Sequence, residues 1–322
     1  MLSAGLRRDS PLLSLRNGMR PSSESPIMPV HPTAVIDPLA QIDESAQVGP
    51  YCVIEGPVRI GARTVLSPYV HILGGTTIGS DCRLHTGCAV GDVPQDKAFQ
   101  GEESYVEIGD GTTLREHVTV HRGTIPGSTT RIGNRCMVMA HAHVGHNCVV
   151  HDEVMLVNGV LLGGHVHVGR RAVISGNAAV HQFARVGEFA MVGGLSKITQ
   201  DIVPYFMVDG HGQCAGINRV GMRRAGIGRD DMEDAKNAFR ILCRTPGTLR
   251  SAVEKLDAAM TTPTGRIIYD FVATSSKRGF HLEPLHKLAA EEPQAPGPVV
   301  LPMPSGEGGD GTGSDAPRSE CG

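Results

Sequence analysis

The chain has 322 residues, a net charge of −3 at pH 7 and a pI near 6.6. These values argue against a nucleic-acid-binding protein, and no basic cluster suggests one. Aromatic residues make up 4% and Trp is absent, whereas Gly occurs 41 times. This balance favours a solenoid, whose narrow interior takes small aliphatic side chains and whose corners take Gly. No apolar run approaches the roughly 20 residues of a spanning helix, so no transmembrane segment is expected.

Residues 1–27 contain Arg, Ser and Pro without a sustained apolar stretch, so a secretory signal is not expected. We predict that this segment is a disordered extension. A transit peptide, or translation that begins at Met28, are two further interpretations that the composition allows. The protein as a whole is expected to be cytoplasmic.

A period of six dominates the next part of the chain. Of the 29 positions reached in steps of six from Val30 to Ile198, 26 hold Val, Ile or Leu. This period belongs to neither an α-helix nor a single strand, and it is typical of hexapeptide repeats, which form the sides of a parallel β-helix. We therefore predict a mainly β protein: a left-handed parallel β-helix over residues 28–204, followed by a small C-terminal α-helical domain.

A second inward position lies four residues after each aliphatic one and holds small residues, while the residues between the two point outward. Because no CxxC motif occurs and a cytosolic protein keeps its thiols reduced, we interpret cysteines at this position as small core residues rather than disulfide partners or metal ligands. Five of the eight cysteines occupy it: Cys52, Cys82, Cys88, Cys136 and Cys148.

Two segments interrupt the repeat, at residues 91–107 and 121–131. The first places Asp96 and Glu102 at positions that should be aliphatic, and the second places Pro126 at one. Both are predicted to be loops extruded from the coil, which is where solenoids build the walls of binding sites.

The histidines avoid the core positions. Twelve of the 15 lie between His31 and His181, and none falls at either inward position. The repeat therefore predicts that they lie on the surface, in solvent or in a site. With three repeats to a coil, residues 18 apart stack at the strand spacing of roughly 4.8 Å. His146, Gly164 and Gln182 form one such column, and the neighbouring histidines that converge on it are His143, His165 and His181.

After the repeat, residues 205–288 are predicted to form the helical domain. Apolar residues recur at helical spacing over residues 232–242, Thr248 suits the N-cap of a second helix, and residues 267–272 suit a third. Residues 289–322 are rich in Pro, Gly, Glu and Ser and are expected to be disordered. Since the flat faces of a β-helix offer little depth for a ligand, a cleft between subunits of a cyclic homo-oligomer is expected.

Seven strings within residues 28–275 point to one family. A generic hexapeptide protein would share the repeat but not these strings in this order. They are GDVPQD at 91–96, VEIGD at 106–110, VHRGT at 120–124, AHVGHNC at 142–148, LGGH at 162–165, AVHQF at 179–183 and MVGG at 191–194. Through them the chain resembles the UDP-N-acetylglucosamine O-acyltransferases, which open lipid A biosynthesis.

The resemblance implies transfer of an (R)-3-hydroxyacyl group from acyl carrier protein to the 3-hydroxyl of UDP-N-acetylglucosamine. It further implies a homotrimer with sites between subunits, and neither a metal nor another cofactor. His146 matches the general base, and an imidazole is suited to taking a hydroxyl proton near neutral pH. The backbone N–H of Gly164 matches the oxyanion donor, where Gly lets the thioester carbonyl approach closely.

The resemblance also assigns substrate contacts. Gln95 and Asp96 match residues that contact the nucleotide sugar or the acyl group. Asn218 and Arg224 match nucleotide contacts, and the planar fork of an arginine suits phosphate oxygens. Gly194 matches the position that limits acyl length, and its missing side chain suggests a longer chain. The acyl chain, pantetheine or sugar would be held by His143, His165, His181 and Gln182.

Three positions depart from the family pattern. Asn147 follows His146 where the best-known members have Asp, and an Asn can orient an imidazole but adds no negative charge. Lys97 lies one residue before the usual Lys of the first loop. Val220 and Ala225 stand where some members carry charges near the nucleotide, so N-acylation of an aminosugar stays open.

Three other interpretations remain. His141 and His146 have the ligand spacing of the γ-class carbonic anhydrases, which are zinc enzymes of the same fold. A sister UDP-sugar N-acyltransferase normally carries an extra N-terminal domain, whereas here the repeats begin by Val30. A non-catalytic solenoid is the third, because Asn147 replaces an acidic residue.

Overall fold

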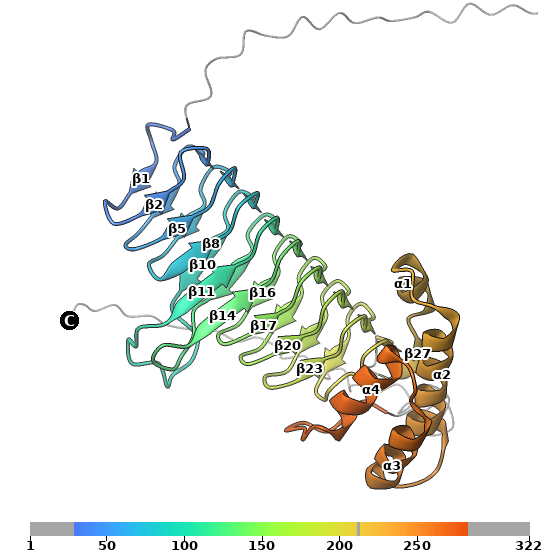
Figure 1. Ribbon diagram of the computed structural model, residues 1–322. Coiled ribbons are helices and arrows are strands. Elements are labelled where there is room, and N and C mark those ends of the chain that lie inside the picture. The colour runs from blue at the N-terminus through green and yellow to red at the C-terminus, as the bar shows by residue number, and fades with distance from the viewer. Residues whose placement is uncertain (1–28, 211–212, 283–322) are drawn as a thin grey trace, which may run out of the picture. The chain divides into compact units, whose positions relative to one another are not determined.

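The computed structural model describes residues 29–210 and 213–282. The predicted disordered segments, 1–27 and 289–322, lie outside these residues. The described chain winds into a coil whose three sides are three sheets (Figure 1). Consecutive strands fall in different sheets, and almost every strand pairs in parallel with the strand three places further along the chain. This is the left-handed parallel β-helix that the period of six predicts, so the predicted fold is confirmed.

The strands are short, and most contain two residues. The first sheet has, within the described residues, β1 (Val35–Ile36), β4 (Val53–Ile54), β7 (His71–Ile72), β10 (Ala89–Asp92), β13 (Thr119–His121), β16 (His143–Val144), β19 (Leu161–Leu162), β22 (Ala179–Val180) and β25 (Lys197–Ile198). The second has β2 (Gln41–Ile42), β5 (Arg59–Ile60), β8 (Thr76–Ile78), β11 (Tyr105–Ile108), β14 (Thr129–Ile132), β17 (Val149–Val150), β20 (His167–Val168) and β23 (Arg185–Val186). The third has β3 (Gln47–Val48), β6 (Val65–Leu66), β9 (Arg83–Leu84), β12 (Thr113–Leu114), β15 (Met137–Val138), β18 (Met155–Leu156), β21 (Val173–Ile174), β24 (Met191–Val192), β26 (Phe206–Val208) and β27 (Cys214–Ile217).

The two interruptions of the repeat leave its phase intact. Val90 pairs with Val120, 30 residues further on, and Val120 pairs with Val144, 24 further on, where an uninterrupted coil takes 18. The extra 12 and 6 residues are whole repeats. Residues 93–104 and 122–128 lie between strands, whereas the outer parts of the two segments belong to β10, β11, β13 and β14.

Both inward positions fill the core. The five cysteines of the second inward position are each at most 2% exposed, so their prediction as core residues is confirmed. Their thiols face the corners, where Cys136 Sγ donates to the carbonyl of His151 and Cys148 Sγ to that of Gly163, both at 3.1 Å. Burial raises the pKa of the Cys88 thiol to about 12, so it stays protonated.

The corners of the coil turn through left-handed residues. The φ angle is 59° at Asn147, 58° at His165 and 66° at Phe183. A non-glycine residue in this region costs roughly 1–2 kcal/mol. Stacking between successive coils offsets part of that cost, as between the rings of His165 and Phe183, whose centres lie 4.7 Å apart. The corners therefore hold side chains in fixed columns.

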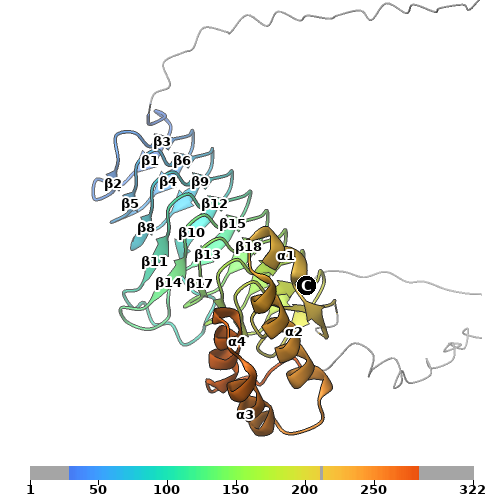
Figure 2. The same cartoon turned by 45° about the vertical axis from the view of Figure 1, so that its right-hand side comes forward.

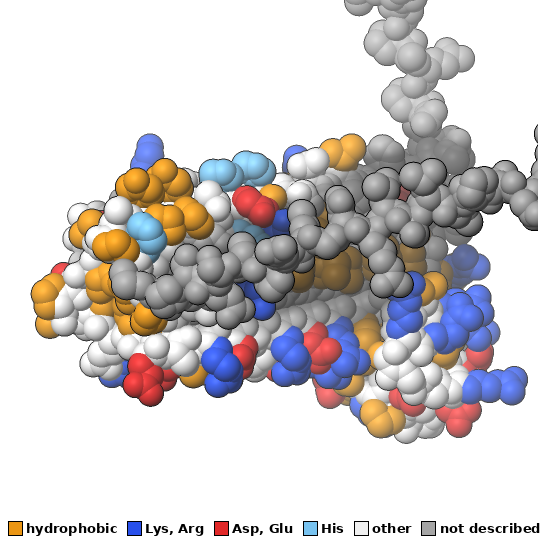
Figure 3. Space-filling model, turned by 90° about the horizontal axis from the view of Figure 1, so that it is seen from above, with side chains coloured by type: hydrophobic (Ala, Val, Ile, Leu, Met, Phe, Trp, Pro, Cys, Tyr) orange, Lys and Arg blue, Asp and Glu red, His pale blue; other side chains and the backbone are white. Residues whose placement is uncertain are grey.

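Charged side chains alternate in sign along one edge of the face seen in Figure 3. Ion pairs link successive coils, for example Arg63 with Asp81 at 2.6 Å and Arg171 with Glu153 at 2.7 Å. Because the first pair is exposed and the second only partly buried, both are screened by water and add little to stability. They link neighbouring coils on the outer surface of the β-helix.

The third sheet continues past residue 204, where the repeat predicts the end of the β-helix. β26 pairs with β24 at Met207 and Met191, a spacing of 16 residues instead of 18, so the count of six loses its phase after Ile198. β27 then pairs with β26 in the antiparallel sense and ends the sheet. The β-structure is therefore longer than the repeat indicates.

Helices close the C-terminal end of the coil (Figures 1 and 2). Phe239 packs edge-on against Phe206 of β26, with ring centres 5.3 Å apart. Thr248 accepts a hydrogen bond from the N–H of Ser251, which confirms it as an N-cap. None of the described helices has both the length and the apolar character to span a bilayer. In the described chain they are α1 (Arg219–Arg224), α2 (Arg229–Arg244), α3 (Leu249–Ala259) and α4 (Pro263–Ala273).

Candidate functional site

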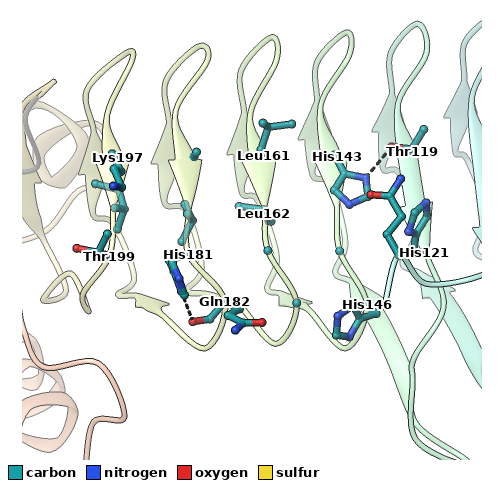
Figure 4. Close-up of a pocket in the computed structure, with 17 residues that line it drawn as sticks. Thr119, His121, His143, His146, Leu161, Leu162, His181, Gln182, Lys197 and Thr199 are labelled. Carbon is teal, nitrogen blue, oxygen red and sulfur yellow. Dashed lines mark hydrogen bonds between the residues drawn. The ribbon is translucent and has the colours of Figure 1, made fainter. Parts of the chain in front are cut away.

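An open groove of about 740 Å³ follows the outer face of the first sheet. One column of paired outward residues crosses it from β13 to β25: Thr119, His143, Leu161, Ala179 and Lys197. Figure 4 shows Thr119 and His143 at one end, Lys197 at the other and Leu161 between them. Leu161 is 51% exposed, so the groove has an apolar middle between polar ends.

The corner beside this groove carries the column that the repeat predicts. His146, Gly164 and Gln182 all line the groove. Their coils are joined by the N–H of His165, which donates to the carbonyl of His146 at 2.9 Å, and by the N–H of Phe183, which donates to that of Gly164 at 3.0 Å. The stacking of these three residues is thus confirmed.

Gly164 leaves room for the imidazole of His146. A Cβ on Gly164 would lie 2.3 Å from both Cε1 and Nε2 of that ring. His165 meets the ring edge-on from the side, with centres 5.2 Å apart, and the His146 side chain is 12% exposed. The backbone N–H of Gly164 has no hydrogen-bond acceptor among the described residues, so it is available to a ligand oxygen.

The hydrogen bonds of Asn147 determine which nitrogen of His146 carries hydrogen. Asn147 Oδ1 accepts from the N–H of Thr124 at 3.0 Å and from its hydroxyl at 2.9 Å. Because a backbone N–H can only donate, the Asn147 atom that faces it is the oxygen. That oxygen lies 2.9 Å from His146 Nδ1, which therefore bears the hydrogen and donates it. Nε2 is left with its lone pair, as a general base requires.

A carboxylate lies near that lone pair. Asp96 Oδ2 is 3.7 Å from His146 Nε2, and Asp96 Oδ1 accepts from the N–H of Ala98 at 2.9 Å, which holds the side chain in place. Asp96 belongs to the loop at 93–104, whose Gln95 lines the groove. A negative charge at this distance stabilises a proton that arrives on Nε2.

One repeat-region histidine lies in the groove, as the repeat allows, but is more buried than its outward position suggests. His121 is 6% exposed. It pairs with Asp92 at the base of the first loop, and its ring meets that of His143 edge-on at 4.7 Å. His121 is outside the core of the coil, as the repeat requires, but neighbouring outward groups cover it, which counting by six does not reveal.

Burial keeps two histidines of the groove neutral. Burial first, and then the charges of the neighbouring His121 and His146, lower the pKa of His143 to about 4. Burial likewise lowers the pKa of His121. His143 Nδ1 lies 2.8 Å from the hydroxyl of Thr119, which orients the ring.

The structure places some of the other predicted site residues at the groove and others away from it. Asp96 and His165 contact His146, and the remaining residues at this end line the groove. Gly194 and Arg224 are exposed and do not line it, and Lys97 does not either. Asn218 is buried, and both ends of its side-chain amide are hydrogen-bonded. Its Nδ2 donates to the carbonyl of Phe189, and its Oδ1 caps α1 by accepting from the N–H of Gly221. The predicted residues that line the groove are Gln95, His143, His146, Gly164, His181 and Gln182.

Sequence reasoning missed two kinds of site residue. The outward column of the first sheet, including Leu161 and Lys197, was accessible by the same count of 18 that found His146. Counting along the repeat could not find Lys277, because this residue follows α4 and reaches the coil only through tertiary contacts. Its Nζ lies 4.8 Å from the centre of the Phe183 ring. Burial first, and then the charges of His146 and Lys277, lower the pKa of His165.

Known protein families match both parts of the chain. The family model for UDP N-acetylglucosamine O-acyltransferase, domain 2, matches residues 201–281, and that for the six-repeat bacterial transferase hexapeptide matches residues 57–92 and 129–164. An acyl-[acyl-carrier-protein]–UDP-N-acetylglucosamine O-acyltransferase of Gloeothece citriformis is 41% identical over 266 residues, which cover 82% of this chain and 95% of the relative. An enzyme of the same name from Anaeromyxobacter is 42% identical over 235 residues, covering 72% and 91%.

Solved structures agree with these relatives. The UDP-N-acetylglucosamine acyltransferase of Francisella novicida superposes with a TM-score of 0.77 at 34% identity, covering 81% of this chain and 96% of that one. The UDP-N-acetylglucosamine O-acyltransferase of Moraxella catarrhalis gives a TM-score of 0.76 at 38% identity, covering 79% and 100%. The likeness therefore extends over most of the chain.

Proposed function

The chain belongs to the UDP-N-acetylglucosamine O-acyltransferase family, and we propose that it moves an (R)-3-hydroxyacyl group from acyl carrier protein to the 3-hydroxyl of UDP-N-acetylglucosamine, in lipid A biosynthesis. One observation carries the assignment of the site. The hydrogen bonds around Asn147 leave the lone pair of His146 Nε2 available beside a groove that is apolar in its middle.

His146 acts as the general base. Its Nε2 takes the proton of the sugar hydroxyl as the hydroxyl oxygen attacks the thioester carbonyl carbon of the donor. The imidazolium that forms is stabilised by Asp96, whose carboxylate lies 3.7 Å from Nε2. Asn147 holds the ring through Nδ1 but carries no negative charge, and that charge is supplied by Asp96 on the Nε2 side of the imidazole.

Gly164 completes the reaction centre. The carbonyl oxygen becomes negative as the hydroxyl adds, and the free N–H of Gly164 is placed one coil beyond His146 to donate to it. When the carbon–sulfur bond breaks, the thiolate of the carrier leaves and takes the proton from the imidazolium. The apolar middle of the groove, at Leu161 and Ala179, would hold the acyl chain.

Two alternative activities are not favoured. The relatives named above are O-acyltransferases that use acyl carrier protein, which supports the sugar hydroxyl rather than an amine as the acceptor. His141 and His146 lie beyond opposite ends of β16 and so turn different corners of the coil. Among the described residues, no cluster of His, Cys, Asp or Glu has the composition and spacing to bind a metal ion.

The proposed working form is a cytoplasmic homotrimer. Its support is that the groove is open on one chain, while Gly194, Asn218 and Arg224 lie away from it. A neighbouring subunit would close the groove and bring its own Arg224 toward the nucleotide and its own Gly194 toward the end of the acyl chain, while Asn218 would act by capping the helix that carries Arg224. Light scattering on the purified full chain tests the trimer by its mass.

The central test compares His146→Ala with His141→Ala, an exposed histidine before the same strand. Product is measured by mass spectrometry with acyl carrier proteins of graded chain length and with UDP-N-acetylglucosamine or its 3-amino analogue. His146→Ala should lose about 100- to 10,000-fold in rate with an unchanged melting temperature, because general-base catalysis contributes about 10²–10⁴. Wild-type activity in His146→Ala would overturn the assignment, and a preference for the amino analogue would replace O-acylation by N-acylation.

A further inference from the structure

Residues 274–282 return from α4 to the last coil of the groove. Arg278 Nε donates to the carbonyl of Thr199 at 3.0 Å, and His281 Nε2 accepts from the N–H groups of Thr199 and Gln200 at 3.3 and 3.2 Å. Thr199 itself lines the groove. The segment is therefore anchored directly beside the site, and side chains on it have a defined place there.

The anchored segment holds Lys277 against the corner that carries the general base. The Lys277 ammonium lies 4.8 Å from the ring centre of Phe183, a cation–π contact. Phe183 stacks on His165 at 4.7 Å, and His165 meets His146 at 5.2 Å. A positive charge therefore lies at the end of a chain of ring contacts that runs from His146 through His165 to Phe183.

The charge of Lys277 is not neutralised. Lys277 is exposed and takes part in no ion pair within residues 29–210 and 213–282. Arg185, by contrast, is paired with Asp201 at 2.6 Å and stacks on Phe271 at 4.4 Å. An uncompensated cation beside an open groove attracts anions, while a paired one holds the fold together.

We propose that Lys277 binds a phosphate group of a substrate in this groove. This rests on the proposed function, in which both substrates carry phosphate: the diphosphate of the nucleotide sugar and the phosphate of the donor's phosphopantetheine arm. Lysine binds phosphate as a point charge with three donors, so the chemistry is common to both sources. Phe183 positions the ammonium without satisfying its hydrogen bonds.

The test compares Lys277→Ala and Lys277→Arg with Lys255→Ala, which removes an exposed lysine of α3 outside the groove. KM and kcat are measured separately for UDP-N-acetylglucosamine and for the acyl donor. Lys277→Ala should raise one KM about tenfold, the size of one charge-assisted hydrogen bond, with little change in kcat. Lys277→Arg should stay within about threefold of wild type, since the charge is kept, and Lys255→Ala should change nothing.

Two arms identify the phosphate. A higher KM for UDP-N-acetylglucosamine assigns Lys277 to the diphosphate. A higher KM for acyl-phosphopantetheine but not for acyl-pantetheine assigns it to the donor. Unchanged KM values for both substrates in Lys277→Ala would overturn the proposal. Calorimetric binding of UDP and of phosphopantetheine to wild type and variant separates this outcome from failure of the proposed function, which would show as a wild-type enzyme without transfer activity.

Discussion

Replacing Gly164 with Ala should displace His146, the proposed general base, without changing the chemistry of its imidazole. The added Cβ would lie 2.3 Å from Cε1 and Nε2 of His146, and ordinary contacts begin at 3.4 Å, so the ring must retreat by ~1.1 Å. A misplacement of about 1 Å costs about 100-fold in rate, or ~2.7 kcal/mol of activation free energy. The backbone N–H at this position is retained in Ala, so the loss reports on the ring rather than on the oxyanion donor.

The matched control is Gly176→Ala. Gly176 occupies the same place in its own repeat, and its Cβ would lie 3.4 Å from Asn158 O and 3.7 Å from a methyl of Val157, both ordinary contacts. Steady-state acyl transfer is measured for both variants, together with thermal unfolding. We expect kcat/KM to fall about 100-fold in Gly164→Ala and to stay unchanged in Gly176→Ala, with both melting temperatures within about 4 °C of wild type.

The reasoning is refuted if Gly164→Ala, folded as judged by its melting temperature, transfers acyl groups as fast as Gly176→Ala. The imidazole would then not be confined by the backbone of Gly164, and the need for Gly at this position would have another cause. A large drop in melting temperature confined to Gly164→Ala would also contradict the argument, because it would place the cost in folding rather than in the reaction.

Three further predictions concern the surroundings of the base. Asn147→Ala should lower kcat about 100-fold by releasing Nδ1 of His146, whereas Asn147→Asp should keep the rate and move the acid limb of the pH–rate profile; equal rates in both variants would count against the tautomer argument. Burial lowers the pKa of His143 to about 4, so the unfolded chain, with an ordinary pKa near 6.5, binds more protons between these values. The stability that His143 contributes is full above pH 6.5 and is lost as the pH falls toward 4. The free energy of unfolding in urea should therefore fall between pH 7 and pH 5, and this fall should be about 1–2 kcal/mol smaller in His143→Gln than in the wild type. Asp201 is 1% exposed and binds Arg185 through both oxygens, so Asp201→Asn should cost about 3 kcal/mol in urea unfolding, and a loss below about 0.5 kcal/mol would show that the pair is dispensable.

The sequence predicts the coil well, because the inward positions of each repeat can be identified from that repeat alone, without knowledge of contacts elsewhere. An aliphatic residue every six positions and a small one four places later specify burial, stacking and the column of His146, Gly164 and Gln182 without any long-range knowledge. The same logic fails where a segment leaves the coil and folds back. His121 is covered by groups at the base of the first loop, and no periodicity encodes where that loop lies.

The C-terminal part shows the same limit. The spacing of apolar residues predicts helices and Thr248 predicts a cap, since both are local properties. The place of Lys277 beside the groove, and so its proposed role, depends on hydrogen bonds between residues about 80 apart, such as Arg278 to Thr199, which no local pattern predicts. Position within a repeat can be counted from the sequence, whereas the return of a segment onto the repeat has to be observed.

The two ends of the coil differ in how they are covered. Val30 is 37% exposed at the first end, whereas Phe206 at the other is fully buried and packs against Phe239. In a stacked fold each coil is supported by its neighbours, and within residues 29–210 and 213–282 the first coil has a coil on one side only, so we expect fraying to begin there. Opening of the first coils can thus proceed through β1 to β6 before it reaches the groove between β13 and β25. The N-terminal coils would thus unfold without disturbing the proposed catalytic residues, which lie in the part of the molecule whose amide protons should exchange last.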